Sequence, residues 1–149
     1  MADRRIRQAI TMLIVLTCCF AAGCGGTTGP EVSSMPSGDG YKIMLSANPG
    51  VITSEGHAAV IAVIIDPQGN PVADEDGGVM FSASAPNTEF VDPETGNVGD
   101  IRGGASQVTL TWEDKSEDET PAASQLCTIT AAYRGAYATV QIILISKSY

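Results

Sequence analysis

The feature that most constrains the fold of this chain is a series of short runs in which every second residue is apolar. A period of two matches the alternation of side chains between the two faces of a β-strand. Turn residues such as Asn48-Pro49-Gly50 separate the runs. No apolar period of 3.6 residues persists long enough for a helix. The pattern predicts about seven strands, at residues 41–45, 60–65, 79–83, 88–91, 108–112, 127–133 and 140–145.

Short strands at this spacing are typical of two antiparallel sheets packed face to face, so we expect an all-β sandwich. One face of each strand then supplies the core, where each buried Leu or Ile contributes about 1.5–3 kcal/mol. The predicted core residues are Val60, Ala62, Ile64, Val79, Phe81, Val108, Leu110, Trp112, Ile129, Val140, Ile142 and Leu144.

Two strands are unusual because their outward residues are also apolar. Ile61, Val63 and Ile65 alternate with the core residues of one strand, and Ile143 and Ile145 do so in another. Either loops or the N-terminal segment cover these faces, or the faces form a patch that meets a partner. We favour local cover, because strands covered on both faces read as continuous apolar runs.

The N-terminus has the pattern of an export signal. Arg4, Arg5 and Arg7 precede an almost continuously apolar stretch at residues 9–20. This is the charged region and short apolar region of a signal peptide. A transmembrane helix needs about 20 apolar residues, and this stretch ends sooner, at small residues and glycines.

The tetrapeptide Ala-Ala-Gly-Cys at residues 21–24 resembles the lipobox of bacterial lipoproteins. That resemblance implies that Cys24 is acylated on its sulfur and becomes the new N-terminus, so that residues 1–23 are a lipoprotein signal peptide. The alternative is an ordinary signal peptide in which Cys24 is incidental. Cys18 and Cys19 are then unremarkable residues of the apolar region.

Cleavage before Cys24 would leave a lipidated cysteine and flexible tether at residues 24–40, rich in Gly, Ser, Thr and Pro, followed by one domain at residues 41–149. The signal carries three Arg and one Asp, which leaves 5 Lys and Arg against 16 Asp and Glu, a net charge of about −11. Such a surface repels phosphate backbones, so nucleic acid is not an expected partner.

Several segments of the domain follow a shared pattern, namely Ile64-Ile65-Asp66, Gly69-Asn70-Pro71-Val72, Val79-Met80-Phe81, residues 103–112 and residues 127–144. They are similar to a strand ending in Val-x-Asp, a Gly-Asn-Pro-Val turn, a Val-x-Phe strand, a Gly-x-Ala-x-Val-x-Leu strand and a closing hairpin. In this order the segments resemble the bacterial immunoglobulin-like repeats of the invasin and intimin type. The resemblance implies an immunoglobulin-like antiparallel β-sandwich and a role in envelope binding or adhesion.

The residues that could carry chemistry give no recognisable motif. His57 lies beside a turn without a Ser, Cys or Asp neighbour in a triad pattern, so we expect a surface histidine. Cys127 alternates with apolar residues, which predicts a buried small side chain and no intramolecular disulfide. The acidic runs at Asp74–Gly77 and Glu113–Glu119 lack the spacing of a calcium loop, and solvated loops are the favoured interpretation. We therefore expect no catalytic residue, no metal ligand and no cofactor.

Together the two resemblances imply a membrane-anchored cell-envelope lipoprotein that presents one immunoglobulin-like domain for protein binding or adhesion. Its expected partners are the membrane, through the acyl anchor on Cys24, and an envelope protein. We expect it at the cell membrane or outer membrane, with the domain facing the periplasm or the exterior. The alternative is a structural accessory subunit that docks onto a larger envelope assembly, because a single domain differs from the tandem repeats of adhesin stalks.

Overall fold

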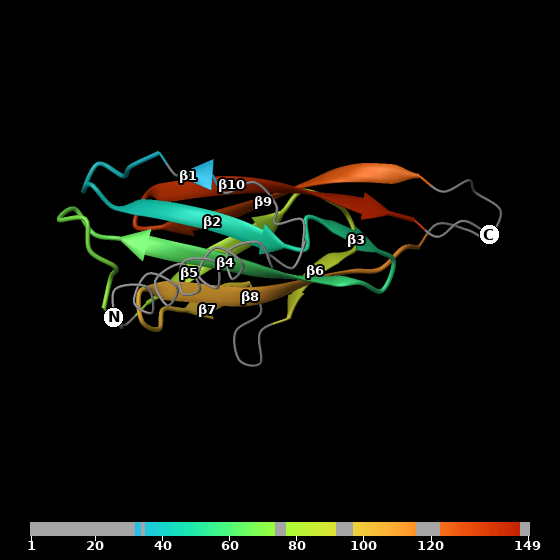
Figure 1. Ribbon diagram of the computed structural model, residues 1–149, viewed down its shortest axis with the longest axis horizontal. Coiled ribbons are helices and arrows are strands. Elements are labelled where there is room, and N and C mark those ends of the chain that lie inside the picture. The colour runs from blue at the N-terminus through green and yellow to red at the C-terminus, as the bar shows by residue number, and fades with distance from the viewer. Residues whose placement is uncertain (1–31, 34, 74–76, 92–96, 116–122, 147–149) are drawn as a thin grey trace, which may run out of the picture.

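The computed structural model describes residues 32–33, 35–73, 77–91, 97–115 and 123–146. Within these ranges the fold is all-β, with ten strand segments and no helix (Figure 1). The predicted signal peptide lies outside the described residues, as do parts of the predicted tether and of both acidic runs. The predicted fold class is confirmed.

The strands form two five-stranded sheets, which we call sheet A and sheet B (Figure 1). Neighbouring strands are antiparallel, except for the pair β3–β10, which is parallel. Sheet A has the order β1 (Val32–Ser33), β2 (Lys42–Asn48), β4 (His57–Ile65), β8 (Ala105–Trp112) and β6 (Thr88–Val91). Sheet B has the order β3 (Val51–Thr53), β10 (Ala136–Ile145), β9 (Ser124–Tyr133), β5 (Gly78–Ala83) and β7 (Val98–Asp100).

This topology is that of an immunoglobulin-like sandwich. In the constant-type immunoglobulin domain, strands A-B-E-D form one sheet and C-F-G the other. Strands β2, β4, β8 and β6 take the places of A, B, E and D, and β5, β9 and β10 take those of C, F and G. The remaining segments β1, β3 and β7 lie at sheet edges. They extend the two sheets and leave the order of the seven immunoglobulin-type strands unchanged.

The seven predicted strands all correspond to observed ones, but the predicted count of about seven is too low over the described residues. The additional segments are β1, β3 and β7, each only two or three residues long. A segment this short has too few residues to display an alternating pattern, and its pairing depends on a neighbour that is distant in sequence.

The core lies between the sheets and is built from the predicted alternation. All twelve predicted core residues are buried, and the most exposed of them, Trp112, retains only 5% of its surface. Phe81 from sheet B packs against Phe90 from sheet A, with ring centroids 5.9 Å apart. The aromatic pair therefore ties the two sheets together near the C-terminal end of β6.

The turn after β4 forms as its residue types predict. The Asp66 Oδ1 atom accepts hydrogen bonds from the backbone N–H groups of Gln68 and Asn70, at 2.9 and 2.8 Å. Gly69 adopts a left-handed φ of 89°, which a residue without a side chain tolerates readily. After the turn the chain returns to the end of β4, where the Val72 N–H donates a hydrogen bond to the Ile64 carbonyl.

Part of the segment predicted as a tether contacts the sandwich. β1 pairs with β2 in the register Val32 to Leu45. Met35 forms an isolated bridge with Tyr137, so this segment also reaches the β10 edge of sheet B. Ser37 then closes a turn in which its Oγ atom accepts a hydrogen bond from the Tyr41 N–H at 3.1 Å.

Candidate functional site

The chain offers two candidate binding features, a hollow at one end of the sandwich and the outer face of sheet B. The hollow has a volume of about 490 Å³ and is lined by the β3–β4 turn, the start of β6 and the end of β8. Because these segments are far apart in the sequence, only the tertiary fold brings them together.

Two backbone hydrogen bonds fix the shape of the hollow around the end of β8. The Glu55 N–H donates to the Trp112 carbonyl at 3.1 Å, and the Glu113 N–H donates to the Asn87 carbonyl at 3.1 Å. Glu55 and Asn87 both adopt left-handed backbone conformations, with φ of 64° and 56°. Asparagine tolerates this conformation better than most residues, whereas glutamate adopts it rarely.

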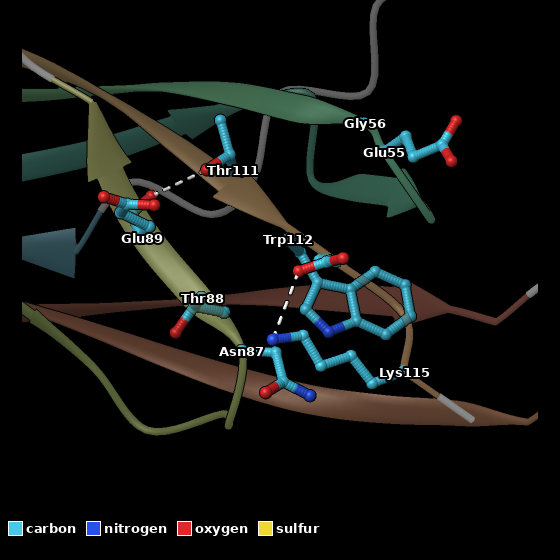
Figure 2. A pocket seen from close by; sticks show the side chains of 9 residues that line it. Glu55, Gly56, Asn87, Thr88, Glu89, Thr111, Trp112 and Lys115 are labelled. Carbon is cyan, nitrogen blue, oxygen red and sulfur yellow. Dashed lines mark hydrogen bonds and ion pairs between the residues drawn. The ribbon is translucent and has the colours of Figure 1, made fainter. Parts of the chain in front are cut away.

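The side chains of the hollow are mostly acidic and polar. Figure 2 shows Glu89 at one end of the lining and Glu55 at the other, with the Trp112 ring below Glu55 and above the Lys115 side chain in this view. Lys115 makes an ion pair with Glu113 at 3.3 Å, with both side chains more than half exposed. The Thr111 hydroxyl donates to the Glu89 carbonyl at 3.2 Å (Figure 2).

This lining suits a polar or cationic group held at the surface. It supplies carboxylate and carbonyl acceptors and one lysine that is already paired, but the indole of Trp112 is nearly covered and offers little stacking surface. Among the described residues, no group of three or more His, Cys, Asp or Glu side chains could hold a metal ion. The acidic character of the hollow therefore indicates no particular ligand.

The second feature is the outer face of sheet B, which we call the sheet B face. Strands β3, β10, β9 and β5 contain no Asp, Glu, Lys or Arg residue, although such residues make up 17% of the chain. The charged residue of sheet B is Asp100 on the edge strand β7, which pairs with Arg102 at 3.6 Å, whereas sheet A carries Lys42 and Glu89, both of them exposed. The part of the sheet B face formed by β3, β10, β9 and β5 is thus a neutral surface on an acidic protein.

The sheet B face also collects the exposed apolar side chains. Seven large hydrophobic residues of the described chain are exposed, and only Val91 lies on sheet A. The other six lie on the sheet B face or beside it, namely Met35, Val51, Met80, Leu126, Tyr137 and Ile143.

A cation is held at the β9–β10 end of this face. Arg134 lies in the β9–β10 turn, with its guanidinium carbon 5.4 Å from the ring centroids of both Tyr41 and Tyr133. Its Nη1 atom donates a hydrogen bond to the Tyr41 hydroxyl at 3.0 Å. These cation–π and hydrogen-bond contacts direct its charge away from the middle of the sheet.

The residues singled out from the sequence do not converge on one site. Cys24 lies outside the described residues. His57 is exposed at the start of β4, and Cys127 is fully buried, both as predicted. Of the acidic run Asp74–Gly77 only Gly77 is described, and of Glu113–Glu119 only residues 113–115.

The two outward apolar sets are separated by the thickness of the sandwich. Ile61, Val63 and Ile65 lie on the outer face of sheet A and are half-buried. Ile143 lies on the sheet B face and is 41% exposed. Because the two sets belong to different sheets, they do not form one common patch, and Ile143 belongs to the more exposed face.

Sequence reasoning missed the contribution of Met80, Leu126 and Tyr137 to the sheet B face. The Arg134-Gly135 turn signals a hairpin, and a hairpin register would have placed Tyr137 opposite Ala132. Placing Met80 beside Ala132 requires the pairing of β5 with β9, which no local signal reveals.

No protein-family model matches this chain, and no curated protein matches it. Within the described part of the chain, no helix has the length and apolar character needed to cross a bilayer. Function is therefore inferred from the residues of the chain itself.

Proposed function

We propose that this protein is a membrane-anchored cell-envelope lipoprotein that presents a single immunoglobulin-like domain for protein binding or adhesion. The anchor is an acylated Cys24. Its support is the series of three arginines, an apolar stretch and small residues that ends at this cysteine. Two acyl chains or more give an attachment that hardly dissociates, because each buried methylene contributes about 0.8 kcal/mol.

The single observation that carries the binding role is the sheet B face. Protein interfaces are depleted in charged residues at their centres and enriched in Tyr and Met. The sheet B face combines an absence of charge in four strands with exposed Tyr137, Met80 and Leu126. This composition fits contact with another protein better than contact with an ion or a small polar molecule.

The resemblance to invasin and intimin repeats supports the same role, since those repeats belong to extracellular adhesins. A structural accessory subunit of a larger envelope assembly is the second candidate, and the absence of charged residues from β3, β10, β9 and β5 suits a permanent contact of that kind. In both cases the domain faces the periplasm or the exterior from the cell membrane or outer membrane.

The anchor is tested by metabolic labelling with a clickable fatty acid, followed by membrane fractionation. Cys24→Ser should abolish labelling and leave an unlipidated precursor or a soluble product, whereas the control variant Cys127→Ala should retain label and membrane association. Cys127 is fully buried and therefore should not accept acyl chains. Labelling that persists in Cys24→Ser would contradict the proposal.

A further inference from the structure

The sheet B face has a pattern that repeats at its two ends. Met80 pairs with Ala132, and Ala132 pairs with Tyr137. We call this line of residues, extended by Met35 beside Tyr137, the tyrosine row. At the other end Ile143 pairs with Leu126 on one side and with Val51 on the other, which gives the isoleucine row.

Polar residues fill the space between the two apolar rows. Thr139 pairs with Thr130, which pairs with Ser82, and Gln141 pairs with Thr128. Tyr137 and Ile143 are six residues apart on β10, so the rows lie about 20 Å from each other along the strands. Along the strands, the face therefore consists of the apolar tyrosine row, two polar rows and the apolar isoleucine row.

We propose that the sheet B face binds the same face of a second copy of this chain. The two-fold axis lies in the plane of contact, perpendicular to the strands. It passes between the polar row Thr139–Thr130–Ser82 and the polar row Gln141–Thr128. An isologous contact requires a surface that is complementary to itself after rotation. This rotation reverses the strand direction, so the tyrosine row of one copy meets the isoleucine row of the other. The polar rows meet each other at the centre, where Thr and Gln side chains can exchange hydrogen bonds.

Charge favours a second copy over a basic partner. The whole chain has a formal net charge of −9, yet the pairing strands of sheet B contain no charged residue. Two copies therefore meet without placing like charges opposite one another, and only the acidic groups outside the contact repel. Added salt screens that repulsion, with a Debye length of about 8 Å at physiological ionic strength. Self-association should consequently strengthen with salt, whereas attraction to a basic partner would weaken.

The size of the face suits a weak dimer. β9 and β10 each have 10 residues, which corresponds to a length of about 33 Å. With strands about 4.8 Å apart, the central three to four strands cover on the order of 500–600 Å² per copy. Specific interfaces bury about 800 Å² per partner, so this contact belongs to the small end of the range.

The position of the N-terminal segment is compatible with this geometry, and this step rests on the proposed lipid anchor. Met35 lies beside the β10 edge of sheet B. A two-fold axis across the strands keeps the β10 edge of one copy beside the β10 edge of the other. Both chains then lead toward their Cys24 anchors from the same side, so two copies in one leaflet can pair. Confinement to a leaflet raises their effective concentration.

Sedimentation velocity of the purified full-length chain in detergent tests this proposal. The dimer fraction should rise with protein concentration and with salt. Leu126→Lys together with Ile143→Lys should reduce dimerisation at least tenfold, because both side chains are exposed, at 56% and 41%, and lie in the isoleucine row. The matched control Val91→Lys with Gln107→Lys adds the same charge to exposed positions of sheet A and should leave dimerisation unchanged. Circular dichroism checks that both double variants fold.

A disulfide experiment tests the register. Thr128 and Thr130 lie on β9, the central strand of sheet B, on either side of the proposed axis. A Thr128→Cys chain mixed with a Thr130→Cys chain should therefore form a mixed disulfide dimer faster than either chain forms one with itself. Equal rates for mixed and self pairs would overturn the proposed axis.

A wild-type chain that stays monomeric at all concentrations and salt levels would overturn the second-copy proposal. Crosslinking in intact cells then distinguishes failure of the proposed dimer from failure of the proposed protein-binding role of the sheet B face. If a different envelope protein is crosslinked through Tyr137 and is lost in the Leu126→Lys, Ile143→Lys variant, the binding role survives without the dimer. If the Leu126→Lys, Ile143→Lys variant shows the same crosslinks as the Val91→Lys, Gln107→Lys control, both the dimer and the binding role of the sheet B face are wrong.

Discussion

Replacement of Phe81 by Ala is the most informative perturbation of the core. Phe81 is fully buried in β5, and its ring packs against Phe90 of the opposite sheet at a centroid distance of 5.9 Å and an interplanar angle of 44°. A Cβ atom built on Gly99 would lie 3.2 Å from Phe81 Cε2, so the backbone of β7 is already packed closely against the ring. The surrounding structure therefore has little freedom to fill the cavity.

Phe81→Ala should lower the free energy of unfolding by about 3–5 kcal/mol, which combines lost burial with the cost of the cavity. Domains of this size have total stabilities of about 5–15 kcal/mol, and each kcal/mol corresponds to roughly 4–8 °C in Tm for a domain near 100 residues. We expect a decrease in Tm on the order of 15–30 °C.

Thermal and urea unfolding of the full-length chain, followed by far-ultraviolet circular dichroism, measures this effect. The control Ser82→Ala alters the next residue of the same strand, which is exposed, and should shift stability by no more than about 0.5 kcal/mol. A Tm for Phe81→Ala equal to that of the control, or a helical spectrum of the wild type, would refute this account of the core.

Two further substitutions test local packing and turn chemistry. Gly99→Ala would bring its Cβ atom into collision with Ser106 Oγ and within 3.0 Å of Val108 Cγ1, so it should destabilise the fold by about 1–3 kcal/mol. The control Gly38→Ala meets no heavy atom within 4 Å, and equal urea midpoints for both variants would contradict the packing argument. Asp66→Ala removes an acceptor for two backbone N–H groups and should cost roughly 0.5–2 kcal/mol, by analogy with the loss of a helix N-cap. Asp66→Asn retains an acceptor oxygen and should recover most of that loss, and an Asn variant as unstable as Ala would point to another role for the side chain.

The core of the sandwich could be predicted from the sequence because burial of one strand face imposes a strict period of two. Val60, Ile64, Phe81 and Ile142 are all fully buried, and the alternation alone indicated them. The chemistry of the Asp66 turn was equally local, since its hydrogen bonds join residues two and four positions apart. Local patterns of this kind need no knowledge of the partner strand.

The short edge strands could not be predicted for the opposite reason. β3 is three residues long and is defined by its parallel pairing with the end of β10, which is some 90 residues away in the sequence. Which sheet holds each strand is likewise a tertiary property. The sequence showed that Ile61 and Ile143 both point outward, but it did not show that they lie on opposite faces of the sandwich.

The candidate binding features depend on the same long-range pairings. The hollow forms because Glu55 and Asn87, from two different loops, both bond to the backbone at the end of β8. The sheet B face forms because β5 pairs with the β9–β10 hairpin. The sequence shows that each of these segments lacks charged residues. Only the pairing of the strands in one sheet shows that together they form a neutral surface.

The proposed attachment of this immunoglobulin-like domain to a membrane depends on the acylation of Cys24. Mass spectrometry of the full-length protein extracted from the membranes of its host measures that modification. The mature chain should begin at Cys24, lack residues 1–23, and carry a diacylglycerol on the cysteine sulfur. A mature N-terminus at another residue, with an unmodified Cys24 thiol, would contradict it.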